Sequence, residues 1–160
     1  MSRSPTQPIL RSFLRRRPHV FPQLVARLKI VYVEDSWADA ELLKRALLQM
    51  LPQADLLHFR DAEAAQQFFS EKGTSRRTVD LAIIDIKLPG MSGDKLILWL
   101  RQQSVFALLP VIALSGGPAF ATVADAQAIG ATCFFLKPTA YNDYIDLVYV
   151  IQDYCEIQPV

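Results

Sequence analysis

The alternation of short apolar runs with helical patterns is the feature that most constrains how this chain folds. From residue 28 onward, five near-continuous apolar runs are separated by segments with apolar residues at helical spacing. Strands covered by helices on both faces have this apolar character, and their alternation with helices is typical of a parallel sheet. We therefore expect an α/β fold with strands at Leu28–Val33, Ala54–Phe59, Val79–Ile84, Pro110–Leu114 and Thr132–Leu136.

A helix is expected after each of these strands. In the first helix, apolar residues recur on one face between positions 40 and 50, and Ser36 followed by Asp39 has the spacing of an N-terminal capping box. A chain of 160 residues that is 51% hydrophobic is about one domain long and can bury a core, which excludes a disordered or fibrous protein. The other helices are expected at Asp61–Glu71, Gly93–Gln102, Pro118–Ile129 and Ala140–Tyr154.

Charge is segregated along the chain. Residues 1–29 hold seven basic side chains and no acid, which leaves 10 basic and 16 acidic side chains for the remainder. We interpret residues 1–27 as a flexible basic arm, 28–156 as the folded domain and 157–160 as a C-terminal tail. Such an arm binds nucleic acid or anionic lipid, pairs with the acidic domain or stays solvated, and we favour the last of these.

The cysteines and the apolar stretches favour a cytoplasmic protein. Cys133 and Cys155 lack the spacing of metal ligands or of a disulfide framework. The longest apolar stretch, 106–114, is far shorter than the roughly 18 residues that indicate a membrane helix. We therefore expect no membrane span.

Polar side chains stand where the predicted strands end. Glu34 and Asp35 follow the first strand, Asp85 ends the third, Ser115 the fourth and Lys137 the fifth. In an open parallel sheet, ligands bind in the crevice at the carboxyl ends of the strands. The sequence therefore predicts that these five residues share a pocket.

This set of side chains suits phosphoryl transfer. Three carboxylates repel one another unless a cation joins them, and Mg²⁺ prefers hard oxygen ligands. Glu34 and Asp35 are suited to hold Mg²⁺ together with Asp85, and Asp85 is the best-placed nucleophile. Lys137 and the metal would neutralise the charge on a phosphoryl group, and Ser115 would donate a hydrogen bond to it.

The run Asp85–Gly93, DIKLPGMSG, resembles the phosphoacceptor motif of receiver domains in two-component response regulators. The acidic pair, Ser115 and the Lys137-Pro138 dipeptide match the other signature positions, with separations of 30 residues from Asp85 to Ser115 and 22 from Ser115 to Lys137. The resemblance implies a flavodoxin-like, doubly wound (βα)₅ sheet of strand order 2-1-3-4-5. It also implies that a histidine kinase or phosphotransfer protein phosphorylates Asp85, and that a partner reads the modified surface.

The resemblance extends to further positions. It implies that the backbone carbonyl of Lys87 is a metal ligand, and that Phe134 is the aromatic switch residue that acts with Ser115, although a core role beside Phe135 is an equal alternative. The opening acidic segment is similar to that of stand-alone regulators paired with bacterial phytochromes, which makes a phytochrome a candidate kinase. Because no residues follow Val160 to form a DNA-binding domain, we expect output through protein contacts.

The last two helices carry more apolar side chains than one buried stripe uses. A surplus of apolar and aromatic surface indicates an interface. In receivers, the face of the fourth helix, fifth strand and fifth helix is the usual dimer or target face, so we expect a homodimer or partner docking there. The alternative is that these side chains are buried inside the domain. The candidate interface residues are Phe120, Val123, Tyr144, Leu147 and Tyr149.

Two rival functions remain at this point. One is a pseudo-receiver, a binding module without phosphate chemistry, which Lys87 and the pair Gly116-Gly117 favour because they depart from the family pattern. The other is a flavodoxin-like electron carrier, but the first strand leads into acids instead of a glycine-rich phosphate loop. We expect a signalling protein that is no enzyme beyond its own phosphorylation and dephosphorylation.

Overall fold

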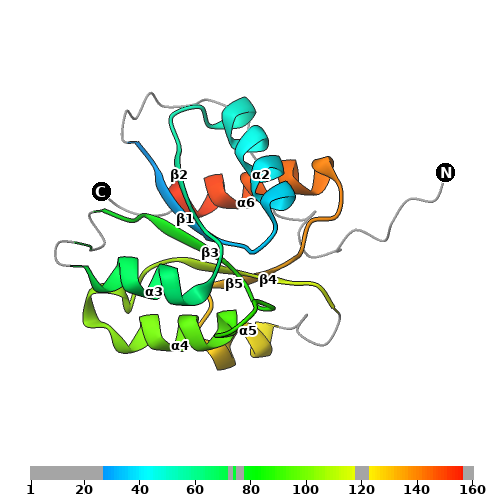
Figure 1. The fold of residues 1–160 in the computed structure, drawn as a ribbon. Helices are drawn as coiled ribbons and strands as arrows, with labels where there is room; N and C mark the ends of the chain where they lie inside the picture. Colours follow the sequence, from blue (N-terminus) through cyan, green and yellow to red (C-terminus); the bar gives the residue numbers. More distant parts are fainter. Residues whose placement is uncertain (1–26, 72–73, 75–77, 118–122, 157–160) are drawn as a thin grey trace.

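The computed structural model describes residues 27–71, 74, 78–117 and 123–156. Its centre is a parallel sheet of five strands in the order β2-β1-β3-β4-β5. The predicted fold class and strand order are therefore confirmed (Figure 1). The strands are β1 (Lys29–Val33), β2 (Asp55–Phe59), β3 (Leu81–Asp85), β4 (Val111–Ser115) and β5 (Cys133–Leu136).

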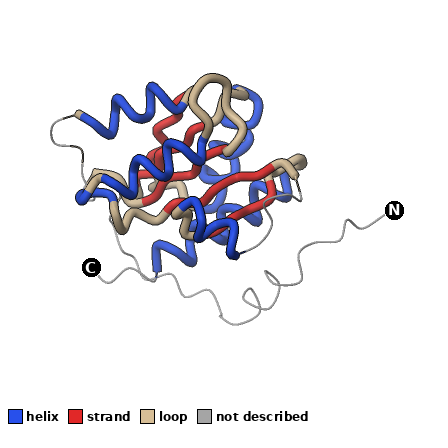
Figure 2. The backbone as a smooth tube through the Cα atoms, turned by 90° about the horizontal axis from the view of Figure 1, so that it is seen from below, coloured by secondary structure: helices blue, strands red, loops and turns tan. Residues whose placement is uncertain are grey.

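Helices cover both faces of the sheet. One face carries α2 and α6 and the other carries α3, α4 and α5, so the sheet lies between two helical layers (Figures 1 and 2). A short 3₁₀ turn, η1 (Ser104–Phe106), leads toward β4. The helices span α2 (Trp37–Met50), α3 (Ala62–Ser70), α4 (Gly93–Gln102), α5 (Val123–Ile129) and α6 (Tyr141–Glu156).

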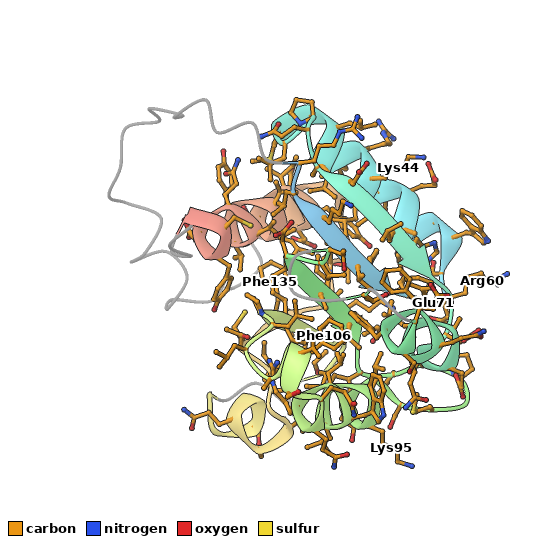
Figure 3. All side chains as sticks on the ribbon, turned by 90° about the vertical axis from the view of Figure 1, so that its left-hand side faces the viewer. Lys44, Arg60, Glu71, Lys95, Phe106 and Phe135 are labelled. Carbon is orange, nitrogen blue, oxygen red and sulfur yellow. The ribbon has the colours of Figure 1, made fainter. Side chains whose placement is uncertain are left out.

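The near-continuous apolar strands are explained by two separate cores. Successive strand residues point to opposite faces, so Val31 joins the core beneath α3 and α4 while Tyr32 joins the core beneath α2 and α6. Phe106 and Phe135, labelled in Figure 3, belong to these two cores respectively.

None of the described helices combines the length and the apolar character that a membrane-spanning helix needs.

The start of α2 confirms half of the predicted capping box. The Ser36 hydroxyl accepts a hydrogen bond from the Asp39 backbone N–H at 3.2 Å. The reciprocal half is missing, because the Ser36 N–H donates instead to Glu34 Oε1 at 3.0 Å. The Asp39 carboxylate lies 3.6 Å from Lys137 Nζ, so a residue expected only to cap a helix contacts the predicted pocket.

The prediction that Tyr144 and Leu147 form an interface is wrong. Both side chains are 0% exposed because α6 packs against the sheet and α2, and this core takes in more of the helix than one stripe. Tyr149 is half-buried. Phe120 and the Val123 side chain lie outside the described residues, as does the arm up to residue 26.

Candidate functional site

The carboxyl ends of the strands bring the predicted site residues together. Asp85 is the last residue of the central strand β3, and Ser115 is the last residue of the neighbouring β4. Glu34 and Asp35 directly follow β1 on the other side of β3, and Lys137 directly follows β5. The shared pocket expected from the sequence is therefore present.

Lys137 is the charge partner of the buried carboxylates. Its Nζ lies 2.7 Å from Asp85 Oδ2 and 3.1 Å from both carboxylate oxygens of Glu34. Asp85 is 1% exposed and Glu34 is 0% exposed. Buried charges are tolerated only when they are paired, so the Lys137 ammonium compensates the buried carboxyl groups of Asp85 and Glu34.

Burial and pairing shift the ionisation of these groups in a consistent way. Burial raises the pKa of Glu34 to about 7, and the Ser36 N–H only partly offsets this effect. Partial burial opposes the charge of Lys137, but the hydrogen bonds and charges of Asp85 and Glu34 outweigh it and hold the pKa of the ammonium above its ordinary value. One cation among several carboxylates leaves the site short of positive charge.

The metal-free protein is expected to lose stability as pH rises from about 5 to 7. The pKa of Glu34 is about 7 in the fold and 4.5 ordinarily, so in this window the folded state holds a proton that the unfolded chain has released. The unfolding free energy should therefore fall by roughly 1 kcal/mol per pH unit in mid-window. Urea unfolding in chelator at pH 5, 6, 7 and 8 measures this, with Glu34→Gln as the control that flattens the slope. If the unfolding free energies of wild type and Glu34→Gln changed equally with pH, the pH dependence could not be assigned to Glu34.

The carboxylates are arranged to accept a hard cation. One oxygen each from Glu34, Asp35 and Asp85 lie within 4.8 Å of one another. Asp35 is exposed while the other two are buried, so a cation held here would have one side open to water or a ligand oxygen. Oxygen ligands with open positions suit Mg²⁺, and the residues present therefore fit the predicted ion.

The loop after β3 is shaped around Asp85. The Lys87 N–H donates to Asp85 Oδ1 at 3.1 Å, while the Lys87 side chain is exposed. The chain then folds back, with the Gly93 N–H donating to the Ile86 carbonyl at 2.9 Å. A Cβ on Gly93 would collide with the Asp85 backbone carbonyl, which explains the glycine at this position of the motif.

The two predicted switch residues have different surroundings. The Ser115 hydroxyl is buried and donates to the Gly117 carbonyl at 3.2 Å, within a glycine pair that has open space around it. Phe134 is half-buried and packs against the core beneath α3 and α4. This packing agrees with the core role and leaves the switch role a prediction.

Two residues near the site were missed by the sequence reasoning. Asp39 is four residues after Asp35, one helical turn away, and this spacing was a usable signal. His58 has no partner that the sequence pattern indicates, yet its Nε2 lies 2.6 Å from the Glu34 backbone carbonyl oxygen. No sequence signal connects His58 to Glu34, because the contact depends on the pairing of β1 with β2.

Comparison with known proteins agrees with this architecture. Response regulator Rcp1 of Synechocystis sp. is 24% identical over 127 residues, covering 78% of this chain and 86% of Rcp1. The crystal structure of its Mn²⁺-bound form superposes with a TM-score of 0.68 at 23% identity, over 83% of this chain and 97% of Rcp1. The phosphorylated cyanobacterial phytochrome response regulator RcpA gives a TM-score of 0.71 at 21% identity, over 84% and 98% of the two chains.

A family assignment follows from the match of most of the chain to one family model. The response regulator receiver domain matches residues 30–149, which include every residue of the pocket described above. This chain belongs to the receiver-domain family of response regulators.

Proposed function

We propose that this protein is a stand-alone response regulator that accepts a phosphoryl group on Asp85 and signals through protein contacts. The observation that carries the proposal is the ion pair between buried Asp85 and Lys137, with one oxygen each of Glu34, Asp35 and Asp85 close enough together to share a metal ion. Because the chain belongs to the receiver family, we do not favour the electron-carrier alternative. The proposed domain boundaries remain 28–156.

Phosphoryl transfer would use the residues in defined roles. A carboxylate oxygen of Asp85 attacks the phosphorus of a phosphohistidine, the P–N bond breaks, and the imidazole leaves with the electron pair and takes up a proton. Bound Mg²⁺ supplies positive charge to the phosphoryl oxygens. Glu34, Asp35, Asp85 and the Lys87 carbonyl would hold it. Lys137 would shift its ammonium toward the phosphoryl group, and Ser115 would exchange the Gly117 carbonyl for a phosphoryl oxygen.

The donor and output are proposed from the relatives. RcpA is named as a phytochrome response regulator, and another structural neighbour is the bacteriophytochrome response regulator RtBRR, which supports a phytochrome-type histidine kinase as donor. A homodimer or partner contact would use α5, β5 and α6, where Leu136 is 45% exposed and Tyr149 is half-buried. A cytoplasmic location accords with this role.

Incubation with acetyl phosphate and Mg²⁺ tests the proposed function. Intact mass spectrometry should show a gain of one phosphoryl group, and a chelator should prevent it. A stable complex with beryllofluoride and Mg²⁺ should form even if the acyl phosphate hydrolyses quickly. Failure of both adducts would refute the proposal and leave the pseudo-receiver alternative.

A further inference from the structure

His58 completes the hydrogen bonding of the acidic loop. Where β1 runs beside β2, the last ladder bond is donated by the Glu34 N–H to the Phe59 carbonyl at 3.0 Å. Because β2 ends at Phe59, the ladder has no further amide to donate to the Glu34 carbonyl. The His58 ring supplies that donor, with Nε2 2.6 Å from the oxygen. A carbonyl oxygen only accepts, so Nε2 carries the proton.

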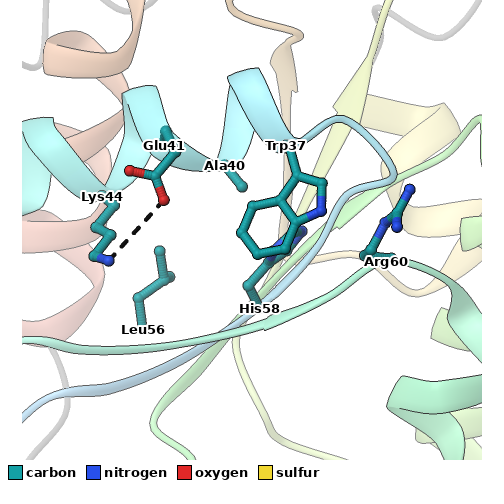
Figure 4. A pocket seen from close by; sticks show the side chains of 7 residues that line it. All are labelled: Trp37, Ala40, Glu41, Lys44, Leu56, His58 and Arg60. Carbon is teal, nitrogen blue, oxygen red and sulfur yellow. Dashed lines mark ion pairs between the residues drawn. The ribbon is translucent and has the colours of Figure 1, made fainter.

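The His58 ring is held in place by aromatic neighbours. The indole of Trp37 meets it edge to face, with centroids 5.4 Å apart and planes at 78° (Figure 4). The ring of Tyr32, its register partner on β1, has its centroid 6.0 Å from that of His58. The ring also lines a hollow between α2 and β2 together with Leu56 and Arg60 (Figure 4). The imidazole therefore has a defined direction relative to the loop.

The hydrogen bond from His58 acts on the next residue. The Glu34 carbonyl and the Asp35 nitrogen share one planar peptide unit, so fixing the carbonyl oxygen fixes the direction in which the chain enters Asp35. Asp35 is the exposed member of the three clustered carboxylates. Glu34 is already held by Lys137 and by the Ser36 N–H, whereas its peptide carbonyl depends on His58.

We propose that His58 is a positioning residue that orients Asp35 for Mg²⁺ through the Glu34–Asp35 peptide. The inference rests on the proposed function, since it assumes that the three carboxylates hold Mg²⁺. Residues that orient metal ligands typically contribute 10–100-fold to metal affinity. The hydrogen bond here acts through the backbone, so we expect about a tenfold effect, at the lower end of that range.

Calorimetric titration with Mg²⁺ alone, without a phosphoryl donor, tests the role of His58. His58→Phe keeps a ring against Trp37 but removes the donor, and should weaken Mg²⁺ binding about tenfold. His58→Gln places an amide N–H near the Nε2 position and should restore most of the affinity. Leu57→Ala, at the neighbouring and 38% exposed position of β2, is the matched control and should bind Mg²⁺ like wild type.

The outcomes separate this inference from the proposed function. Equal Mg²⁺ affinity of wild type and His58→Phe, or equal weakening in the Phe and Gln variants, would overturn the positioning role while the proposed function stands. Absence of Mg²⁺ binding to wild type would overturn both. A thermal unfolding curve of each variant identifies loss of binding that comes from unfolding, and a folded His58→Phe protein with weakened binding supports the inference.

Discussion

Asp85→Asn is expected to abolish phosphorylation by acetyl phosphate while the protein remains folded. The asparagine side chain has the size of aspartate, but its amide oxygen lacks the charge and nucleophilicity that attack on phosphorus requires. Loss of a nucleophile costs several orders of magnitude in rate, so we expect a fall on the order of 10³-fold or more and no adduct in the intact mass.

The fold should tolerate Asp85→Asn because Lys137 keeps its other partners and position 85 still offers it a hydrogen-bond acceptor. The amide oxygen at position 85 can still accept from Lys137, which also keeps Glu34 and Asp39 as partners, while the hydrogen bond from the Lys87 N–H is lost because the amide NH₂ cannot accept it. Removing one of several clustered carboxylates also removes repulsion. We therefore expect the unfolding free energy to change by about 1 kcal/mol or less, as measured by urea denaturation.

Asp94→Asn is the matched control for the nucleophile. Asp94 is a half-buried carboxylate in the first turn of α4, outside the cluster of Glu34, Asp35 and Asp85. The Asp94 variant should acquire the phosphoryl group like wild type. An adduct that persists in Asp85→Asn would contradict the assignment, and peptide mapping would then locate the true acceptor.

The strand ends were predictable from sequence because they depend on local pattern. Each strand ends at a polar residue or directly before one, and a parallel sheet gathers those ends at one edge, so the sequence pattern is enough to group Asp85, Ser115 and Lys137. The hydrogen bonds that Lys137 donates to Asp85 and Glu34 follow from the same gathering of strand ends at one edge of the sheet. Position along a strand therefore carries most of the information about this site.

Contacts that depend on lateral packing were not predictable in the same way. The His58 bond to Glu34 needs the register of β1 against β2, which no local pattern specifies. Tyr144 and Leu147 were misjudged because helical periodicity tells which residues share a face but not how wide a face the sheet and α2 cover. The width of a buried face is a property of the assembled layers.

Lys137→Met is expected to impair both phosphorylation and stability. The methionine side chain approximates the lysine stem but has no charge, so the phosphoryl oxygens lose a cation in the transition state. Removing one such group typically slows the chemical step by 10²–10³-fold, which we expect for the rate of adduct formation with acetyl phosphate. Intact mass spectrometry of samples quenched at successive times measures this rate.

The stability effect of Lys137→Met should exceed that of Asp85→Asn, although both break the same ion pair. Removing the lysine leaves Glu34 and Asp85 buried without their cation, and an uncompensated buried charge costs roughly 3 kcal/mol or more.

Low pH or Mg²⁺ should restore part of the unfolding free energy that Lys137→Met loses. A proton on Glu34 or a bound cation replaces the missing positive charge. Lys87→Met is the matched control: it removes an exposed ammonium two residues from Asp85 and should change the unfolding free energy by less than about 0.5 kcal/mol. Equal destabilisation by the two methionine substitutions in urea denaturation would show that Lys137 is not the charge partner of the buried carboxyl groups of Glu34 and Asp85.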